Sequence, residues 1–247
     1  MSRRVDWISA PAGPIRGELT IPGDKSISHR AIMLAAVAEG TSRISGFLEG
    51  EDTLATAAAF AALGVSIEAP EPSRRVVHGV GLDGLRAASA PIDCGNAGTG
   101  MRLLAGLLCG QVFDSVLVGD ESLSRRPMRR VIEPLAAMGA SIVSAPGDVP
   151  PLRIAGGCTL RGIRYTPPVA SAQVKSAALL AGLYAEGETE IREIHATRDY
   201  TERMLAAFGW PIAFSPGYAK LAGRQRLRAT DVAVPADFSS AAFFIVA

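Results

Sequence analysis

The stretch Pro22-Gly23-Asp24-Lys25-Ser26-Ile27-Ser28-His29-Arg30 leads directly into the apolar residues 31–38, and this pattern predicts a polar loop that becomes a helix. Two basic and two hydroxyl side chains stand where a helix has free backbone N–H groups and the positive end of its dipole. Such a helix start suits a phosphate or carboxylate group. The alternative is a capped helix with solvated charges, because Ser and Asp are common N-caps.

The composition fits a globular α/β protein. Of the 247 residues, 48% are hydrophobic and 26 are glycine, which favours a sizeable core of closely packed helices. The net charge of +1 predicts binding to neither nucleic acid nor an anionic membrane surface. Residues 1–13 lack the apolar segment of a secretory signal, and no apolar run approaches the length of a membrane span. We therefore expect a cytoplasmic protein in which Cys94, Cys109 and Cys158 are buried or incidental thiols.

An internal repeat organises the rest of the chain. Three times, a basic residue opens a helix of small apolar residues, and a strand-like run follows. The helix segments are residues 30–36, 102–106 and 175–182, and the strand-like runs are residues 41–47, 115–118 and 189–194. A charged turn and a second helix come next, and each second helix ends at a glycine that suits a left-handed C-terminal cap. These glycines are Gly64, Gly139 and Gly209.

Each second helix has a face of residues at helical spacing, and two short strands follow it. The expected buried faces are Leu54, Ala57, Ala58 and Ala61 in the first unit, Met128, Val131, Ile132 and Leu135 in the second, and Thr201, Met204, Leu205 and Phe208 in the third. One unit therefore comprises helix, strand, helix, strand and strand, with an entering strand before it. Three such units predict an α/β domain from about residue 15 to about residue 230.

The last residues of the chain begin the pattern again. Residues 235–247 resemble residues 168–180, which open the third unit, and the chain stops inside the expected helix. A single repeat cannot bury its apolar face alone. We therefore expect this chain to be a piece of a longer protein.

Polar residues gather where each loop meets the first helix of its unit, and together the loops form a candidate site for anionic ligands. The three loops are residues 24–30, 95–102 and 170–175. Gly98 and Gly100 allow backbone N–H groups to approach an anion, while Ser171 and Gln173 add neutral donors. Arg126 is a candidate clamp for a carboxylate or phosphate. The alternatives are a plain tight turn at the glycines and a solvated helix start at the arginine.

Several sharper motifs are excluded by the sequence. Gly23-Asp24-Lys25-Ser26 lacks the Lys directly after the second Gly that a Walker A loop requires, and no G-x-G-x-x-G opens a helix after a strand. His29, His78 and His195 have no metal-ligand spacing, and His29 is better explained as a capping or packing residue than as a base. Cys94 has no partnered His in a nucleophile pattern, which favours a small buried residue.

Together these motifs resemble the family of 5-enolpyruvylshikimate-3-phosphate synthases. The matching residues run in order along the whole chain, which corresponds to roughly the first half of that family's length. They are Pro22-Gly23-Asp24-Lys25-Ser26-Ile27-Ser28-His29-Arg30, Gly95-Asn96-Ala97-Gly98-Thr99-Gly100, Arg126-Pro127-Met128, Ser171-Ala172-Gln173 and Thr197-Arg198-Asp199-Tyr200-Thr201-Glu202.

The resemblance implies an inside-out α/β barrel of two domains, each built from three repeated βαβαββ units. By this resemblance, residues 1–20 and 232–247 are parts of the first domain, and residues 21–231 are the complete second domain. We expect the full-length protein to be a monomer.

The resemblance also implies ligands for the first three motifs. Lys25, Ser26 and Arg30 match contacts of shikimate 3-phosphate, and Lys25 also faces phosphoenolpyruvate. Gly98 and Arg126 match contacts of phosphoenolpyruvate.

The later motifs complete the implied ligand set. Ser171, Ala172 and Gln173 match contacts of the phosphate and ring of shikimate 3-phosphate, and Gln173 reaches both substrates. Arg198 matches a further phosphate contact. Many family members have a second serine where this chain has Ala172, so position 172 offers only its backbone.

The implied reaction transfers the enolpyruvyl group of phosphoenolpyruvate to the 5-hydroxyl of shikimate 3-phosphate and releases phosphate through a tetrahedral intermediate. It requires cations around two phosphates and a carboxylate, together with general acids and bases, and it needs no metal or organic cofactor. The family's catalytic Asp, Glu and Lys lie in its second half. We therefore expect no catalytic residue in this chain, which would bind shikimate 3-phosphate weakly and show negligible turnover.

Two other interpretations are weighed against this one. Enolpyruvyl transferases that act on UDP-N-acetylglucosamine share the fold, but Lys25-Ser26 stands in place of their Lys-Asn, and their catalytic cysteine loop has no counterpart in this sequence. A non-catalytic, phosphate-binding half-protein that pairs with a separately encoded partner is also compatible with the sequence. We prefer the N-terminal portion of a synthase to both.

Overall fold

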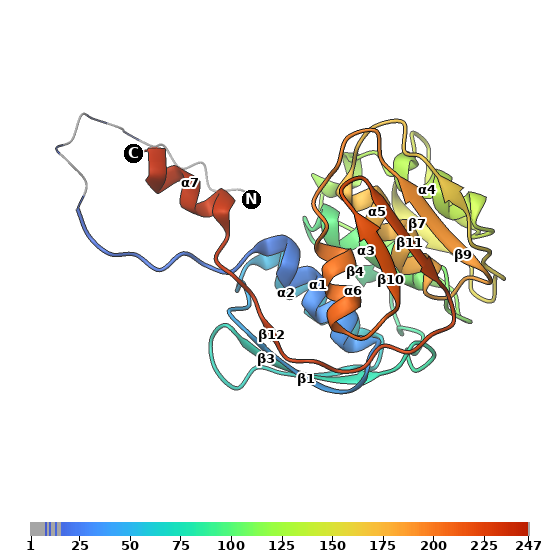
Figure 1. The fold of residues 1–247 in the computed structure, drawn as a ribbon, viewed down its shortest axis with the longest axis horizontal. Coiled ribbons are helices and arrows are strands. Elements are labelled where there is room, and N and C mark those ends of the chain that lie inside the picture. Colours follow the sequence, from blue (N-terminus) through green and yellow to red (C-terminus); the bar gives the residue numbers. More distant parts are fainter. Residues whose placement is uncertain (1–7, 9, 11–12, 14–15, 247) are drawn as a thin grey trace.

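The computed structural model describes residues 8, 10, 13 and 16–246, and three repeated units form its body (Figure 1). The first unit comprises α1 (Lys25–Ala36), β1 (Glu39–Ser45), α2 (Glu51–Ala62), β2 (Ser66–Glu68) and β3 (Arg74–Val80). The second comprises β4 (Ile92–Asp93), α3 (Gly98–Leu108), β5 (Ser115–Val118), the 3₁₀ turn η1 (Leu123–Arg125), α4 (Arg129–Ala137), β6 (Ile142–Ala145) and β7 (Val149–Ile154). The third comprises β8 (Arg164–Tyr165), α5 (Ala172–Gly182), β9 (Glu188–Arg192), α6 (Tyr200–Ala207), β10 (Ile212–Ser215) and β11 (Tyr218–Ala222).

The three sheets share one strand order. The orders are β12-β1-β3-β2, β4-β5-β7-β6 and β8-β9-β11-β10, where β12 is Val232–Ala233. In each sheet the first pair is parallel and the other pairs are antiparallel. Gly64, Gly139 and Gly209 follow the second helices with φ of 91°, 103° and 80°, as left-handed caps require. The threefold repeat predicted from the sequence is therefore confirmed.

The first unit departs from the prediction at its entering strand. The sequence predicts this strand before α1, but residues 16–22 form none. Its place is taken by β12, which pairs in parallel with Ile44 and Ser45 of β1. The chain thus returns after the third unit to complete the first sheet, which extends past the domain boundary expected at residue 231.

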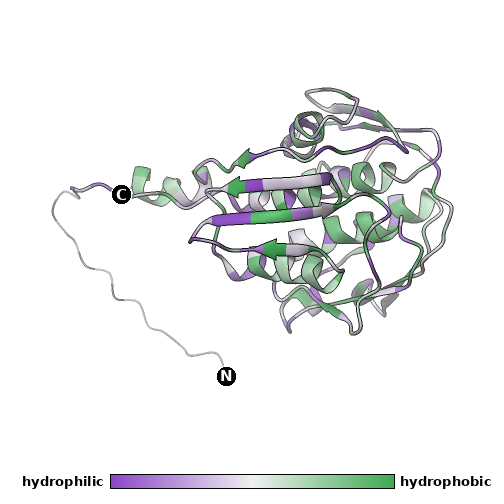
Figure 2. Ribbon diagram, turned by 90° about the horizontal axis from the view of Figure 1, so that it is seen from below, coloured by the Kyte–Doolittle hydropathy of each residue, from purple (hydrophilic) through white to green (hydrophobic). Residues whose placement is uncertain are grey.

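The first helices of the units form the centre of the fold. Residues 31–38 are fully buried, and most of α3 and α5 is buried as well. A Cβ at Gly106 would lie 2.3 Å from the carbonyl oxygen of Ala177, so glycine lets α3 pack closely against α5. Strands cover these hydrophobic helices on the outside (Figure 2), which confirms the inside-out α/β arrangement.

Two of the three predicted second-helix faces are confirmed. The faces of α4 and α6 point inward, with Ile132 only partly buried. The prediction for α2 is wrong, because Leu54 is exposed and the buried residues are Thr53, Thr56, Ala59 and Phe60. Alanine is tolerated on buried and exposed faces alike, so the alanines of α2 do not indicate which face is buried. The two threonines are buried because their hydroxyls find hydrogen-bond partners.

The chain's last described element is α7 (Phe238–Val246), which confirms the predicted helix. It stands apart from the three sheets (Figure 1), and none of its residues is buried. Residues 1–20 lie largely outside the described part of the chain. The assignment of residues 1–20 and 232–247 to another domain therefore stays a prediction.

Candidate functional site

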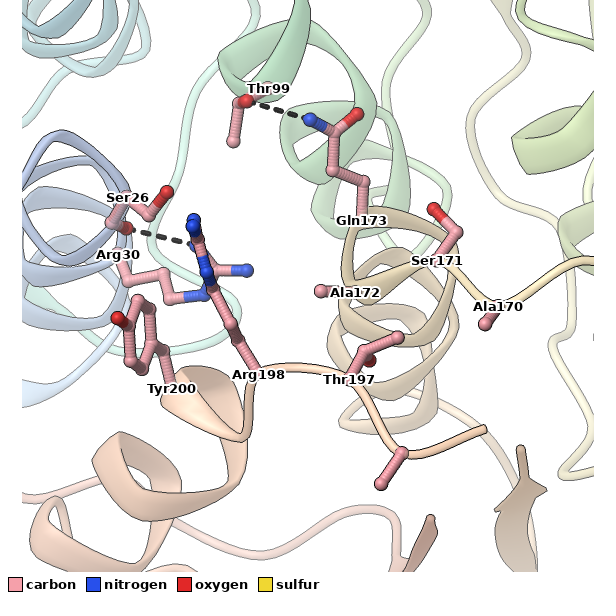
Figure 3. Close-up of a pocket in the computed structure, with 11 residues that line it drawn as sticks. Ser26, Arg30, Thr99, Ala170, Ser171, Ala172, Gln173, Thr197, Arg198 and Tyr200 are labelled. Atoms are coloured by element: carbon pink, nitrogen blue, oxygen red, sulfur yellow. Dashed lines mark hydrogen bonds between the residues drawn. The ribbon is translucent and has the colours of Figure 1, made fainter. Parts of the chain in front are cut away.

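The starts of α1 and α5 and the loop before α6 surround an open cavity of about 580 Å³ (Figure 3). None of the residues found to line it is acidic. They are Ser26, Arg30, Thr99, Ala170, Ser171, Ala172, Gln173, Ala196, Thr197, Arg198 and Tyr200.

The loop before α1 places the start of this helix at the cavity. Asp24 is the N-cap, and its Oδ1 accepts a hydrogen bond of 2.8 Å from the backbone N–H of Ile27. Ser26 lines the cavity, whereas Lys25 is about half exposed and forms an ion pair with Asp52 of α2. Both interpretations of this stretch therefore hold in part, because a capped helix also presents polar groups to a cavity.

Arg30 joins three helices beneath the cavity. Its Nε donates to Thr201 Oγ1 at 2.7 Å, its Nη2 to Ser176 Oγ at 2.7 Å and its Nη1 to the carbonyl oxygen of Ser26 at 2.9 Å. Burial lowers the pKa of Arg30 to about 10, so the side chain remains a cation at neutral pH. A guanidinium this well fixed is suited to binding an anion.

Arg198 brings a second guanidinium to the same cavity. It extends from the loop before α6 toward Arg30, and its charge contributes to the lowered pKa of Arg30, after the effect of burial (Figure 3). Its guanidinium carbon lies 5.9 Å from the ring centroid of Tyr200. Two cations and the Ser171 hydroxyl thus stand around a space that holds no opposing carboxylate among its lining residues.

The start of α5 is connected to the start of α3 through Gln173. Ser171 is the N-cap of α5, and its Oγ accepts from the N–H of Val174 at 3.4 Å. Gln173 Nε2 donates to Thr99 Oγ1 at 2.9 Å, and Gln173 Oε1 accepts from Arg102 Nη1 at 2.9 Å. Gln173 therefore lies on the border between the cavity and the start of α3.

A corner rich in arginine lies beyond Gln173. Gly98 is the first residue of α3, and a Cβ there would stand 3.1 Å from Nη1 of both Arg102 and Arg126. Arg126 donates to Asn96 Oδ1 and, at 3.2 Å, to Ser122 Oγ. The pKa of Arg102 is lowered by burial and then by the charges of neighbouring arginines. These guanidiniums repel one another, so an anion at this corner would be favoured.

The structure brings some predicted site residues together and separates others. Six of them line the cavity, namely Ser26, Arg30, Ser171, Ala172, Gln173 and Arg198. Lys25 is held by Asp52, while Gly98 and Arg126 belong to the neighbouring corner.

Sequence reasoning placed Thr99 and Arg102 in the loop 95–102 but gave neither a role of its own, and it missed Thr197 and Tyr200 as cavity residues. The sequence pattern did single out Arg102 as the basic residue before the small apolar residues of the second unit, although α3 itself begins at Gly98.

From the sequence, His29 was weighed as a base and Cys94 as a nucleophile, and in the structure both are buried packing residues. His29 is fully buried, its Nδ1 lies 2.7 Å from Thr56 Oγ1, and burial lowers its pKa to about 4. Cys94 is buried, and burial raises the pKa of its thiol to about 12. Across the described residues, no three His, Cys, Asp or Glu side chains are grouped to hold a metal ion. The helices described in this structure include none that is long and apolar enough to cross a membrane.

Comparisons with known proteins agree on one family. The family model of EPSP synthase (3-phosphoshikimate 1-carboxyvinyltransferase) matches residues 10–247. Curated relatives named 3-phosphoshikimate 1-carboxyvinyltransferase, from Xanthomonas campestris pv. campestris (strain B100) and Xanthomonas oryzae pv. oryzae (strain PXO99A), are 69% and 68% identical over 241 residues.

These alignments cover 98% of this chain and 55% of each relative, so the chain spans about half the length of the curated relatives it matches. A solved structure of EPSP synthase from Acinetobacter baumannii is 54% identical with a TM-score of 0.89. The match covers 93% of this chain and 52% of that one.

Proposed function

Because this chain belongs to the EPSP synthase family, we propose that it binds shikimate 3-phosphate and phosphoenolpyruvate for the transfer of the enolpyruvyl group. The observation that carries the proposal is the cavity of about 580 Å³ where Arg30 and Arg198 meet the start of α5. A phosphate dianion is stabilised by guanidinium groups and by the backbone N–H groups of a helix start.

The phosphate of shikimate 3-phosphate is proposed to bind between Arg198 and the start of α5, where Ser171 offers a hydroxyl and Ala172 a backbone N–H. Ser26, Arg30 and Lys25 on the α1 side are proposed to contact the rest of that substrate. The support is that these groups, Lys25 excepted, line one cavity. Lys25 would exchange its ion pair with Asp52 for a substrate contact.

Phosphoenolpyruvate is proposed to bind at the corner of Gly98 and Arg126. Gln173 supports this arrangement because its amide already joins the cavity to α3 through Thr99 and Arg102, which places it between the two ligands. In the proposed reaction the 5-hydroxyl gives up its proton to a base as its oxygen bonds to C2 of phosphoenolpyruvate, and C3 takes up a proton from an acid. Loss of phosphate from C2 and of a proton from C3 then regenerates the enolpyruvyl group.

No acidic side chain is found among the described residues that line the cavity, which leaves this proton transfer without a candidate there. Glu193 and Glu202 are buried against Lys175, and Asp24 caps α1. The chain by itself is therefore proposed to bind substrates without turning them over. In the full-length enzyme we propose that residues 21–231, together with β12, form one complete domain of a cytoplasmic monomer.

A phosphate-release assay tests this function. The purified chain should release no phosphate from the two substrates, alone or with either one omitted. Addition of the remaining C-terminal part of the Xanthomonas campestris relative should restore release. Turnover by the chain alone contradicts the proposed division of roles, and a silent mixture of two folded parts contradicts the proposed activity.

A further inference from the structure

A fully buried ion cluster lies below the cavity, outside the residues assigned to the substrates. Lys175 of α5 is 2% exposed, and its Nζ lies 2.8 Å from Glu193 Oε2 and 2.8 Å from Glu202 Oε1. Both carboxylates are as deeply buried as the lysine. Withdrawing three charges from water costs several kcal/mol per ion, so such a cluster is weak evidence for a purely stabilising role.

One member of this cluster closes the loop that carries Arg198. Glu193 directly follows β9, and its carboxylate accepts from both the hydroxyl and the backbone N–H of Thr197, the latter at 3.3 Å. The backbone N–H of Glu193 donates to the carbonyl oxygen of Gly217 at 2.8 Å, which fixes the loop to the β10–β11 turn. Arg198 is the next residue after Thr197, so the loop leaves it pointing into the cavity (Figure 3).

A second polar layer is formed by the residues next to Lys175 and Glu202 on the same two helices. Ser176 follows Lys175 and Thr201 precedes Glu202, and their hydroxyls are 2.8 Å apart while both accept from Arg30. Among the charges, the two cations Arg30 and Lys175 balance the two carboxylates. The polar contacts between α5 and α6 therefore hold Arg30 directly, and they hold Arg198 indirectly through Glu193 and Thr197.

We propose that Lys175 is a positioning residue that directs Arg198 toward the substrate phosphate by holding Glu193 against Thr197. This inference rests on the proposed function of the cavity. Lys175 touches no substrate in this account; it neutralises the carboxylate that shapes the loop. The phosphate then meets a guanidinium whose position is already set, which reduces the entropy lost on binding.

The sharpest test is Glu193→Gln, because Lys175 and Glu202 remain as a balanced pair. The glutamine amide offers one acceptor oxygen where the carboxylate offers two, so the Thr197 loop loosens. The variant should bind shikimate 3-phosphate about fivefold more weakly than the parent in calorimetric titrations, with shikimate binding unchanged. Glu188→Gln is the matched control, because Glu188 forms a surface ion pair with Lys220 at the same 2.8 Å. It should leave both affinities unchanged.

A double-mutant cycle separates positioning from general loosening. In an Arg198→Gln background, Glu193→Gln should cost less than about twofold further affinity, because its effect passes through the missing guanidinium. Additive losses overturn the proposal, and so do equal losses for shikimate and shikimate 3-phosphate or an unaltered Glu193→Gln variant.

Lys175→Met can replace Glu193→Gln in the double-mutant cycle with Arg198→Gln. If Lys175→Met does not fold, the result for Glu193→Gln alone tests the proposal. A parent chain that binds no shikimate 3-phosphate contradicts the proposed function instead, so the two failures are distinguishable.

Discussion

The first helices of the second and third units, α3 and α5, both carry a basic residue near the N-terminus, and the fold uses the two residues in opposite ways. Lys175 of α5 is buried between two glutamates. Arg102 of α3 is half-buried, hydrogen-bonded to Gln173 and surrounded by other arginines, and no carboxylate among the described residues pairs with it. A repeated sequence pattern thus yields a buried, paired cation in one unit and, within the described part of the chain, an unpaired cation beside the proposed phosphoenolpyruvate site in the other.

The largest expected difference between the two helix starts is in folding stability. Lys175→Met leaves two buried carboxylates without their cation and should lower the free energy of unfolding by about 3–5 kcal/mol. Arg102→Met loses hydrogen bonds but relieves charge repulsion, so its cost should stay within about 1 kcal/mol. Urea denaturation of both variants and the parent measures the difference. Similar losses in both would show that the two cations do not differ in role.

The first helix of the first unit, α1, differs from α5 because it holds a buried histidine near its start in place of a buried ion pair. This histidine makes the free energy of unfolding depend on pH. Burial lowers the pKa of His29 from 6.5 to about 4, so the unfolded chain binds a proton that the folded chain excludes. This contribution to stability is complete above pH 6.5 and is lost as the pH falls toward 4. Between pH 7.5 and pH 5 it should remove about 2 kcal/mol.

Urea denaturation at both pH values, in the parent and in His29→Gln, isolates the contribution of His29 to the free energy of unfolding. The parent should lose about 2 kcal/mol more than the variant over that interval. His195→Gln changes an exposed histidine and should behave like the parent. Equal losses in the parent and in His29→Gln would contradict the assignment of His29 as a neutral packing residue.

The smallest effect on stability is expected at Gly98. A methyl group there would push two flexible guanidiniums by a few tenths of an ångström, while alanine favours the helix. Gly98→Ala should therefore change the unfolding free energy by less than about 1 kcal/mol. Binding of phosphoenolpyruvate should weaken by about fivefold, because Arg102 and Arg126 are displaced. Calorimetric titration checks this, and unchanged affinity would remove the Gly98 corner from the proposed site.

The repeat made most of the fold predictable from sequence. Glycine caps and apolar periodicity are local signals, and they placed two helices and three strands in every unit. The entering strand of the first unit was not predictable in this way, because β12 reaches β1 from the far end of the chain. The buried face of α2 also failed, since Thr53 and Thr56 are buried through hydrogen bonds that periodicity does not register.

The residues of the candidate site were predictable where they belong to a sequence motif. They were not predictable where their role depends on partners that are distant in the sequence. Ser26, Arg30 and the Ser171–Gln173 run all reach one cavity. The fate of Lys175 depends on Glu193 and Glu202, which approach it only after β9 and α6 have packed. No local pattern distinguishes that lysine from Arg102, so only the structure separates the buried cation from the available one.

Calorimetric titration with shikimate 3-phosphate and with shikimate measures whether the cavity between α1 and α5 recognises a phosphate group, as we propose. We predict one site per chain that binds shikimate 3-phosphate at least about tenfold more tightly than shikimate. This preference should disappear in Arg198→Gln. Equal affinity for the two compounds, or a preference that survives loss of Arg198, would contradict the account.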